Sequence, residues 1–232
     1  MRAATGASIV HALSKNATAG ENAYELIRSD IIFGHLKPGQ RLRLEEIKST
    51  YDVSVSTIRE ILYRLDSERL VVAEGQRGFM VAPVTRKNFR DIAAMRIFIE
   101  GYALTKAFSQ GDVEWEAQVV AAHHRLSRHE EKIISGDRSN PEAWKNYDRA
   151  FHHALVSACG SETLLQTHRR LFDQYLRYQI IAVIFRGSIA AEEHRQLLQC
   201  ALDRDHAEAL EILSTHINSC VNHTIDNGLL PD

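Results

Sequence analysis

The sequence predicts a mainly α-helical protein, with a small N-terminal unit that ends in a β-hairpin and a larger all-helical C-terminal unit. The four prolines lie far apart, and the stretches between them carry apolar residues at helical spacing. Two short β-rich runs flank a glycine-bearing turn over 74–78, which indicates a hairpin. No comparable strand pattern follows Pro83. Hydrophobic residues make up 44% and charged residues 25%, which is typical of a globular chain.

Several classes of protein are disfavoured by composition. The longest apolar run, 180–185, has six residues, whereas a membrane-spanning helix needs about 20. The first residues contain no unbroken apolar stretch, so we expect no secretory signal. Cys159, Cys200 and Cys220 show no CxxC spacing, which argues against a disulfide scaffold or a zinc ribbon. We therefore expect a cytoplasmic protein. The formal net charge of −2 does not by itself indicate a nucleic-acid partner.

The N-terminal unit is expected to consist of a flexible tail over 1–17 and a domain over 18–82. Its first helix begins at Thr18, which has capping-box spacing to Glu21, and ends before Gly34. The remaining predicted elements are helices at 44–51 and 54–69 and strands at 70–73 and 79–81.

The C-terminal unit is expected to be a helical domain over 88–228, joined to the first by a linker at 83–87. Thr85 is suited to cap its first helix. The predicted helices span 86–109, 113–135, 141–158, 162–186, 189–203 and 206–226. The later helices are preceded by good N-cap residues, namely Asp112, Asn140, Ser161, Ser188 and Asp205.

The element order of the N-terminal unit is that of a winged helix-turn-helix, in which one helix enters the major groove of DNA and the hairpin reaches the backbone. Short hydroxyls and Arg59 near the start of the 54–69 helix are suited to phosphate and base contacts. The alternative is a structural domain whose serines cap a helix and whose arginines are solvated. The expected DNA-binding residues are Arg43, Ser54, Ser56, Thr57, Arg59, Arg77 and Gly78.

Four residues of the C-terminal unit have the chemistry of a metal site. Asp148 and His152 are four apart, on one face of a helix, while His194 and His216 lie on later helices. Three imidazoles and a carboxylate suit a divalent cation, with zinc expected first and nickel or manganese as alternatives. The competing interpretation is an ordinary exposed hydrogen-bonded pair at i, i+4.

The N-terminal unit resembles the GntR family of bacterial transcription regulators. The resemblance rests on the segment 53–65, on the Arg77-Gly78-Phe79-Met80-Val81 hairpin, and on 36–42 before them. It implies a winged helix-turn-helix that binds short palindromes as a dimer, with Arg59 in a family position. The chain departs from the family at Val55, where the family usually has Arg or Lys, at Thr57, where it has Pro, and at Arg69, where it often has Gly.

The C-terminal unit resembles the FCD-type effector domain of the FadR branch of that family. The matching motifs are Arg96 to Glu100, Asp148 to His152 followed by Cys159-Gly160, Glu193-His194, 203–209 and His216-Ile217. The resemblance implies that Asp148, His152, His194 and His216 bind a metal at the base of a pocket for small organic acids. Ser161 departs from the usual Asn.

Two arginines are candidates to bind the carboxylate of such an effector, Arg96 and Arg177. The alternatives are an ion pair between Arg96 and Glu100, and a surface position for Arg177. The chain is thus expected to be a ligand-responsive transcription regulator rather than an enzyme. We expect a repressor that binds a palindromic operator in double-stranded DNA as a homodimer, without a membrane partner. A metal-dependent hydrolase is a second hypothesis, although the sequence has no HExxH motif. Sensing of the metal itself is a third.

Overall fold

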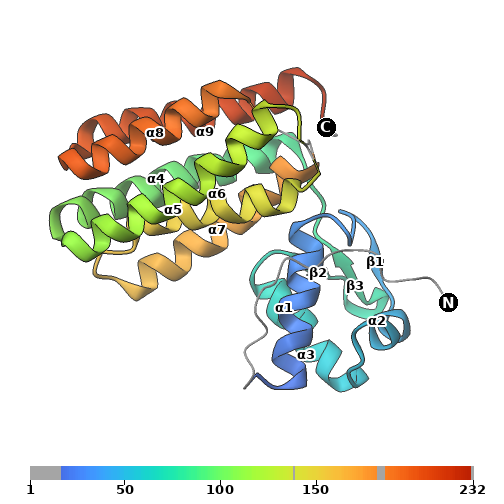
Figure 1. Ribbon diagram of the computed structural model, residues 1–232. Helices are drawn as coiled ribbons and strands as arrows, with labels where there is room; N and C mark the ends of the chain where they lie inside the picture. Colours follow the sequence, from blue (N-terminus) through green and yellow to red (C-terminus); the bar gives the residue numbers. More distant parts are fainter. Residues whose placement is uncertain (1–16, 138, 182–185, 231–232) are drawn as a thin grey trace.

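The computed structural model describes residues 17–137, 139–181 and 186–230, and it confirms the predicted fold class (Figure 1). The predicted tail, apart from Ala17, and the 182–185 part of the predicted 162–186 helix lie outside the described residues. The elements are α1 (Ala19–Ile32), β1 (Arg41–Leu42), α2 (Leu44–Tyr51), α3 (Val55–Ser67), β2 (Val71–Ala73), a 3-10 turn (Gly75–Arg77), β3 (Phe79–Val81), α4 (Arg86–Gln110), α5 (Val113–Ile134), α6 (Pro141–Val156), α7 (Glu162–Ile181), α8 (Ser188–Asp203) and α9 (His206–Asp226).

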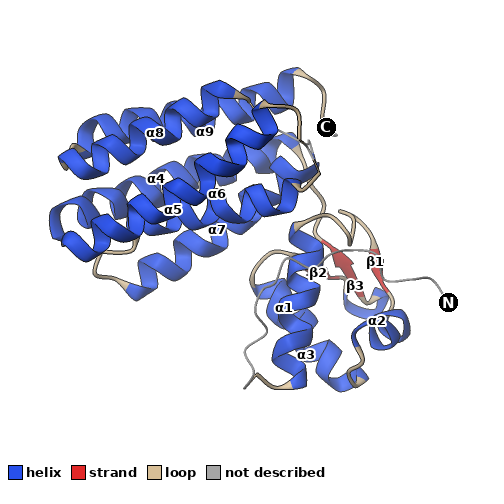
Figure 2. Cartoon of the chain, in the orientation of Figure 1, coloured by secondary structure: helices blue, strands red, loops and turns tan. Residues whose placement is uncertain are grey.

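The N-terminal unit packs α1, α2 and α3 against a small antiparallel sheet of order β1-β3-β2 (Figure 2). The β2–β3 hairpin was predicted, but β1 was not. With only two residues, Arg41 and Leu42, β1 is too short to show the alternation that marks a strand. Ile27, Ile58 and Leu62 are fully buried at the centre of this unit.

Local capping explains where most of the helices begin. The Thr18 hydroxyl accepts from the Glu21 amide, and the Glu21 carboxylate accepts from the Thr18 amide, completing the predicted capping box. The side chains of Thr85, Asp112, Asn140, Ser161 and Asp205 cap their helices in the same way. The predicted cap at Ser188 is wrong. Ser188 is the first residue of α8, and Gly187, at a φ of +64°, precedes it.

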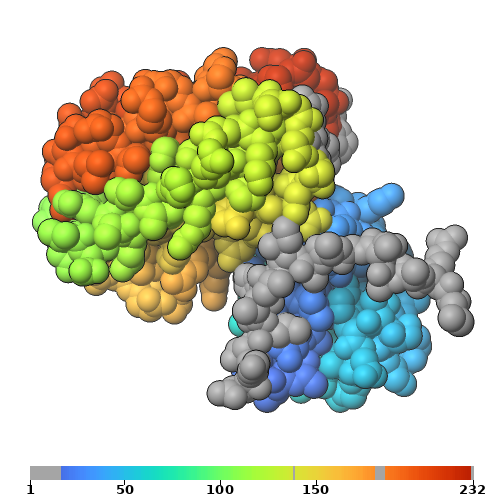
Figure 3. Space-filling view, viewed as in Figure 1, coloured from blue at the N-terminus to red at the C-terminus, as the bar shows by residue number. Residues whose placement is uncertain are grey.

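The C-terminal unit is a bundle of α4 to α9 around one apolar core. Helix α4 contacts α6, α7 and α9, while α5 packs on α6 and α8. The core includes four fully buried side chains, Phe89, Leu104, Phe151 and Leu213. In the space-filling view the bundle and the N-terminal unit form two lobes (Figure 3). Within the described residues, no helix is long and apolar enough to cross a membrane.

Candidate metal centre and DNA-binding surface

The four predicted metal ligands meet in the middle of the bundle. Asp148 and His152 come from α6, His194 from α8 and His216 from α9, and one ligand atom of each lies within 4.8 Å of the others. All four side chains are buried. The spacing of four residues between Asp148 and His152 places both on the inner face of α6, as the sequence predicted. The alternative of an exposed Asp–His pair is therefore wrong.

Each ligand histidine is held by a glutamate on the side away from the cluster. The Nδ1–Oε distances are 2.6 Å for His152 to Glu100, 2.7 Å for His194 to Glu130 and 2.7 Å for His216 to Glu193. A carboxylate that accepts from Nδ1 fixes the tautomer in which Nε2 carries the free lone pair. Three such pairs therefore leave the Nε2 atoms as the available ligands.

Burial and charge set the protonation of the cluster. Burial pushes the pKa of Asp148 up, but Lys145 and His194 outweigh it and hold that pKa well below its usual range. Burial lowers the pKa of His216 to about 3. Burial also acts to lower the pKa of His194, but the carboxylates of Asp148 and Glu130 raise it to about 9. In the metal-free chain His194 is thus the one ligand histidine whose pKa lies above neutrality.

The residues fit a divalent cation. The Nε2 atoms of His152 and His194 are buried and have no hydrogen-bond partner among the described residues. Both face the same carboxylate oxygen, because Asp148 Oδ1 lies 3.7 Å from His152 Nε2 and 3.3 Å from His194 Nε2. Unpaired buried nitrogens are costly in a folded protein, and a shared cation would satisfy them.

A small cavity adjoins the ligands. It measures about 10 Å³, which is room for about one water-sized group. Its wall includes basic, amide and thiol side chains that sequence reasoning did not single out; the lining residues are Trp144, Lys145, Asp148, Gln179, Arg186, Ala190, His194, His216 and Cys220. The Lys145 Nζ atom lies 3.4 Å from Asp148 Oδ2 and donates to Gln179 Oε1 at 2.9 Å.

The glutamates behind the histidines also escaped the sequence analysis as functional residues. Glu193 is the neighbour of His194 in the chain, and Glu100 ends the Arg96 motif, so both stood within motifs already noted. Glu130 carries no such signal. Its role depends on α5 packing against α8, which a single sequence does not reveal.

The two candidate effector-binding arginines lie in different places. Arg96 is buried under the ligand cluster, where its Nε donates to Glu100 at 2.8 Å. Its Nη1 and Nη2 atoms have no hydrogen-bond partner among the described residues. Arg177 is not brought to the cavity, because its Nη2 donates to the carbonyl of Ala82 at 2.5 Å, at the junction between the units. It is also buried rather than on the surface.

The predicted DNA-reading residues surround the start of α3. Ser54, Ser56 and Arg59 are exposed. The Ser54 hydroxyl caps the helix by accepting from the Thr57 amide at 3.2 Å, and it also lies 2.7 Å from the Ser56 hydroxyl. Arg59 forms no ion pair with any residue that the structure describes, so its guanidinium is free for phosphate or base contacts.

The second group of predicted DNA contacts lies at the hairpin and at α2. Arg77 is exposed in the 3-10 turn between β2 and β3, and Gly78 follows it at a φ of +86°. A positive φ suits glycine, which has no Cβ. Arg43 precedes α2 and is exposed, but its Nη1 donates to Glu46 at 3.0 Å.

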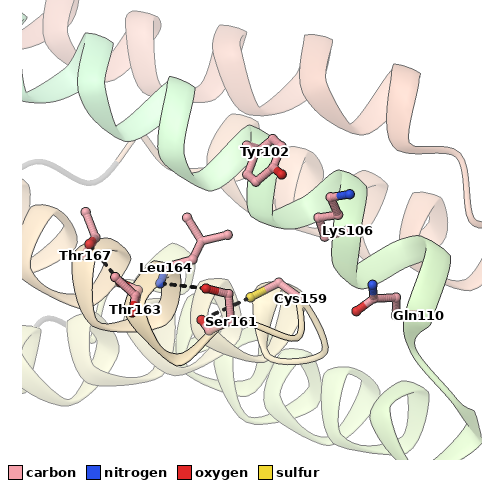
Figure 4. Close-up of a pocket in the computed structure, with 8 residues that line it drawn as sticks. All are labelled: Tyr102, Lys106, Gln110, Cys159, Ser161, Thr163, Leu164 and Thr167. Carbon is pink, nitrogen blue, oxygen red and sulfur yellow. Dashed lines mark hydrogen bonds between the residues drawn. The ribbon is translucent and has the colours of Figure 1, made fainter.

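A larger pocket lies elsewhere, between α4 and the beginning of α7 (Figure 4). Its volume is about 410 Å³. Figure 4 shows Tyr102, Lys106 and Gln110 on one wall and the turn at Cys159 and Ser161 with Thr163, Leu164 and Thr167 on the other. None of the four clustered ligands lines this pocket.

Two family models match the chain, one for each unit. Residues 19–81 match the model described as bacterial regulatory proteins, gntR family. Residues 91–219 match the FCD domain, which covers more than half of the chain. The boundaries agree with the two units of the structure.

Relatives and solved structures agree with these matches. The HTH-type transcriptional regulator BphR of Paraburkholderia xenovorans is 38% identical over 90% of this chain and 86% of its own length. The HTH-type transcriptional repressor GlaR of Escherichia coli is 35% identical over 84% and 91%. The E. coli McbR/YncC structure has the same fold, with a TM-score of 0.77 at 19% identity over 91% of this chain and 99% of that one. The chain belongs to the GntR family of bacterial transcription regulators, with an N-terminal DNA-binding helix-turn-helix domain and a C-terminal FCD domain.

Proposed function

We propose that this regulator binds a palindromic operator as a homodimer, represses transcription, and responds to a small organic acid in a metal-containing pocket. The observation that carries the sensing part is the buried cluster of Asp148, His152, His194 and His216, in which every histidine is backed by a glutamate. The DNA-binding part is supported by the free Arg59 guanidinium at the exposed start of α3.

Zinc is the proposed metal, because three imidazole nitrogens and one carboxylate suit a borderline divalent cation. Nickel and manganese are the alternatives. When bound, such a cation supplies a Lewis-acidic centre with open positions for an anionic ligand. Elemental analysis of the purified chain is expected to find about one divalent ion per chain, lost in His194→Ala. A metal-free wild type with an intact fold would contradict the metal centre.

The charges around the cluster support an anionic effector. Four carboxylates are buried in and around the cluster, namely that of the ligand Asp148 and those of Glu100, Glu130 and Glu193, which hold the ligand histidines. The basic side chains that face them are Arg96, Lys145 and Arg186. Near neutrality the protonated His194 is the fourth positive charge, because its pKa is raised to about 9, so the metal-free cluster is balanced. A divalent cation that displaces this proton leaves an excess of one positive charge. A carboxylate would balance that excess, and the two unpaired Nη atoms of Arg96 are suited to receive it.

A thermal shift series tests the effector class. The zinc-loaded chain is mixed with a panel of small mono- and dicarboxylic acids, with neutral amides of the same shape as controls. At least one acid is expected to raise the melting temperature, and Arg96→Met is expected to remove that rise. If no acid changes the melting temperature more than its amide does, the organic-acid proposal fails.

A second candidate signal is the metal itself. The size of the cavity favours it, because about 10 Å³ accommodates an ion but not a ligand of several heavy atoms unless the wall moves. Titration of zinc into a DNA-binding assay without any organic acid separates the two. A full change in operator affinity with zinc alone favours metal sensing. The hydrolase hypothesis gains nothing comparable, since Glu100, Glu130 and Glu193 are each engaged with a ligand histidine.

The proposed dimer is supported by an apolar stripe on α4. Met95, Phe98 and Tyr102 are 48%, 69% and 54% exposed and lie on one face of the helix. Sedimentation analysis is expected to give twice the chain mass, and Phe98→Glu is expected to shift it toward the monomer. A wild type that stays monomeric at micromolar concentration would contradict the dimer.

Operator binding is tested by mobility shift with DNA from around the regulator's own gene, at low salt. We expect a retarded species whose affinity is reduced when either half of a palindrome is scrambled. The absence of any retarded species would contradict the proposal. Repression is tested separately, by a transcriptional reporter with and without the regulator.

A further inference from the structure

Helix α7 belongs to the bundle but is bound along its second half to the DNA-binding unit. Phe172 and Leu176 pack into the same apolar cluster as the core of α1 to α3. Gln174 Nε2 donates to the carbonyl of Glu68 at 2.9 Å. Arg177 Nη2 donates to the carbonyl of Ala82, which lies just before the linker. In Figure 1, α7 is the bundle helix beside α1.

The centre of this contact is a row of alternating charges that we term the interdomain clamp, formed by Arg149, Asp173, Arg28 and Glu68. Asp173 on α7 is 1% exposed and pairs with Arg28 of α1 and, at 3.1 Å, with Arg149 of α6. The Arg28 Nε atom also donates to Glu68 Oε2 at 3.0 Å. Asp173 therefore joins the first helix of the DNA-binding unit to the helix that carries two metal ligands.

Other side chains of α7 contact the surroundings of the metal cluster. His168 Nε2 lies 3.2 Å from Glu100 Oε2, on the carboxylate that holds His152. The Phe172 ring lies under the guanidinium of Arg96, with 4.1 Å between the guanidinium carbon and the ring centroid. Gln179 accepts the hydrogen bond from Lys145 at the cavity wall. Helix α7 thus contacts both the DNA-binding unit and the residues that surround the metal ligands.

We propose that α7 transmits the state of the metal cavity to the DNA-binding unit through the interdomain clamp. This inference rests on the metal-containing pocket proposed above. A divalent cation held by the four ligands would repel the ammonium of Lys145, which lies 3.4 Å from Asp148 Oδ2 and donates to Gln179 of α7. Arg96, whose Nε donates to the carboxylate that holds His152, stacks on Phe172 of α7 and faces the same change in charge. A buried ion pair that loses one partner leaves an uncompensated charge, so the clamp is either formed or broken. Occupancy of the cavity then shifts the balance between a clamped and a released DNA-binding unit.

Hydrogen exchange on the full-length chain, followed by mass spectrometry, tests this inference. Wild type and Asp173→Asn are compared with and without zinc. In the wild type, zinc is expected to slow exchange in peptides of α6, α8 and α9, and also in α1, which holds no ligand. In Asp173→Asn the ligand-bearing helices keep their response to zinc, the α1 response is lost, and exchange in α1 rises about tenfold or more in both states.

Two further variants make the result interpretable. Glu162→Gln removes a carboxylate from the exposed first turn of α7 and is expected to behave as wild type. Arg149→Gln removes the link to α6 but leaves the pair between Arg28 and Asp173, so α1 keeps its baseline exchange and loses most of its response to zinc. Because Arg149 is 26% exposed, this variant serves if Asp173→Asn does not fold.

The failures are distinguishable. If zinc protects the ligand helices but α1 responds equally in wild type and Asp173→Asn, the inference is wrong while the metal centre stands. If bound zinc does not change hydrogen exchange in α1 of the wild type, the inference is also wrong. If the wild type binds no zinc, the metal centre fails, and unchanged baseline exchange of α1 in Asp173→Asn then overturns the clamp as well.

Discussion

Replacement of Glu130 by Gln tests whether the glutamates that hold the ligand histidines raise the affinity for the metal. Glu130 Oε1 lies 2.7 Å from His194 Nδ1, and the two side chains are 2% and 1% exposed. The amide oxygen of Gln still accepts from Nδ1 but carries no charge, so the imidazole becomes a weaker ligand. Loss of such a partner costs about 10–100-fold in metal affinity, which is about 1.4–2.7 kcal/mol.

The pH dependence of this loss follows from the pKa of His194. In the metal-free wild type that pKa is raised to about 9, so near pH 7 zinc must displace a proton from the imidazole. Removal of the Glu130 charge lowers the pKa and reduces this competition. The variant's deficit is therefore expected to be small near pH 7 and to approach the full 10–100-fold near pH 9.

Zinc affinity is measured by competition with a chromophoric chelator at several pH values. The matched control is Glu131→Gln, because Glu131 is 60% exposed and pairs with Arg128 on the surface. The control is expected to bind zinc as the wild type does at every pH. Equal affinity of Glu130→Gln and wild type at both pH 7 and pH 9 would refute the reasoning.

Three further predictions concern other parts of the chain. Arg59→Ala should weaken DNA binding by about 1–3 kcal/mol, with an unchanged circular dichroism spectrum. The control variant Arg90→Ala, at an exposed position of α4, should bind DNA as the wild type does. An equal loss of DNA affinity in both variants would contradict a role of Arg59 in recognition. Arg69 has a φ of +58°, and left-handed backbone costs a non-glycine residue about 1–2 kcal/mol, partly offset by glycine entropy. Denaturant unfolding should thus show Arg69→Gly to be as stable as wild type or more so, and a clear destabilisation would contradict the strain. Burial raises the pKa of the Cys200 thiol from 9.0 to about 11. Near pH 8, iodoacetamide should therefore label Cys200 of the folded chain at least about a hundredfold more slowly than that of the chain unfolded in urea, and the labelling rate should rise with pH. Equal labelling rates in the two states would show that the thiol is not protected.

Local signals in the sequence were sufficient for most of the elements. Capping residues such as Thr18 and Asp112 have a short-range chemistry that the chain satisfies within three residues, so the helix starts could be predicted. Ser188 failed because Gly187 adopts a positive φ before the helix and leaves no capping side chain at that position. The strand at Arg41 was missed because its pairing with Met80 is a tertiary contact.

The site was predictable only in its inner layer. The spacing of Asp148 and His152 and the family motifs indicated the ligands. Glu130 and Lys145 gain their roles from helices that meet across the bundle, and no short-range pattern marks such contacts. Arg177 shows the converse. Its positive charge led to the prediction that it binds the effector, but its turn of α7 faces the linker and the Ala82 carbonyl.

The glutamate-backed cluster draws on every helix of the bundle. Glu100 comes from α4, Glu130 from α5, Asp148 and His152 from α6, His168 from α7, Glu193 and His194 from α8, and His216 from α9. A single ion would bind directly to α6, α8 and α9, and the glutamates that hold its histidines would connect it to α4 and α5. Its removal would loosen the point where these helices meet. Proteases cleave such loosened chains faster than tightly folded ones. The lifetime of the regulator would then follow the supply of the ion, independently of whether any operator is bound.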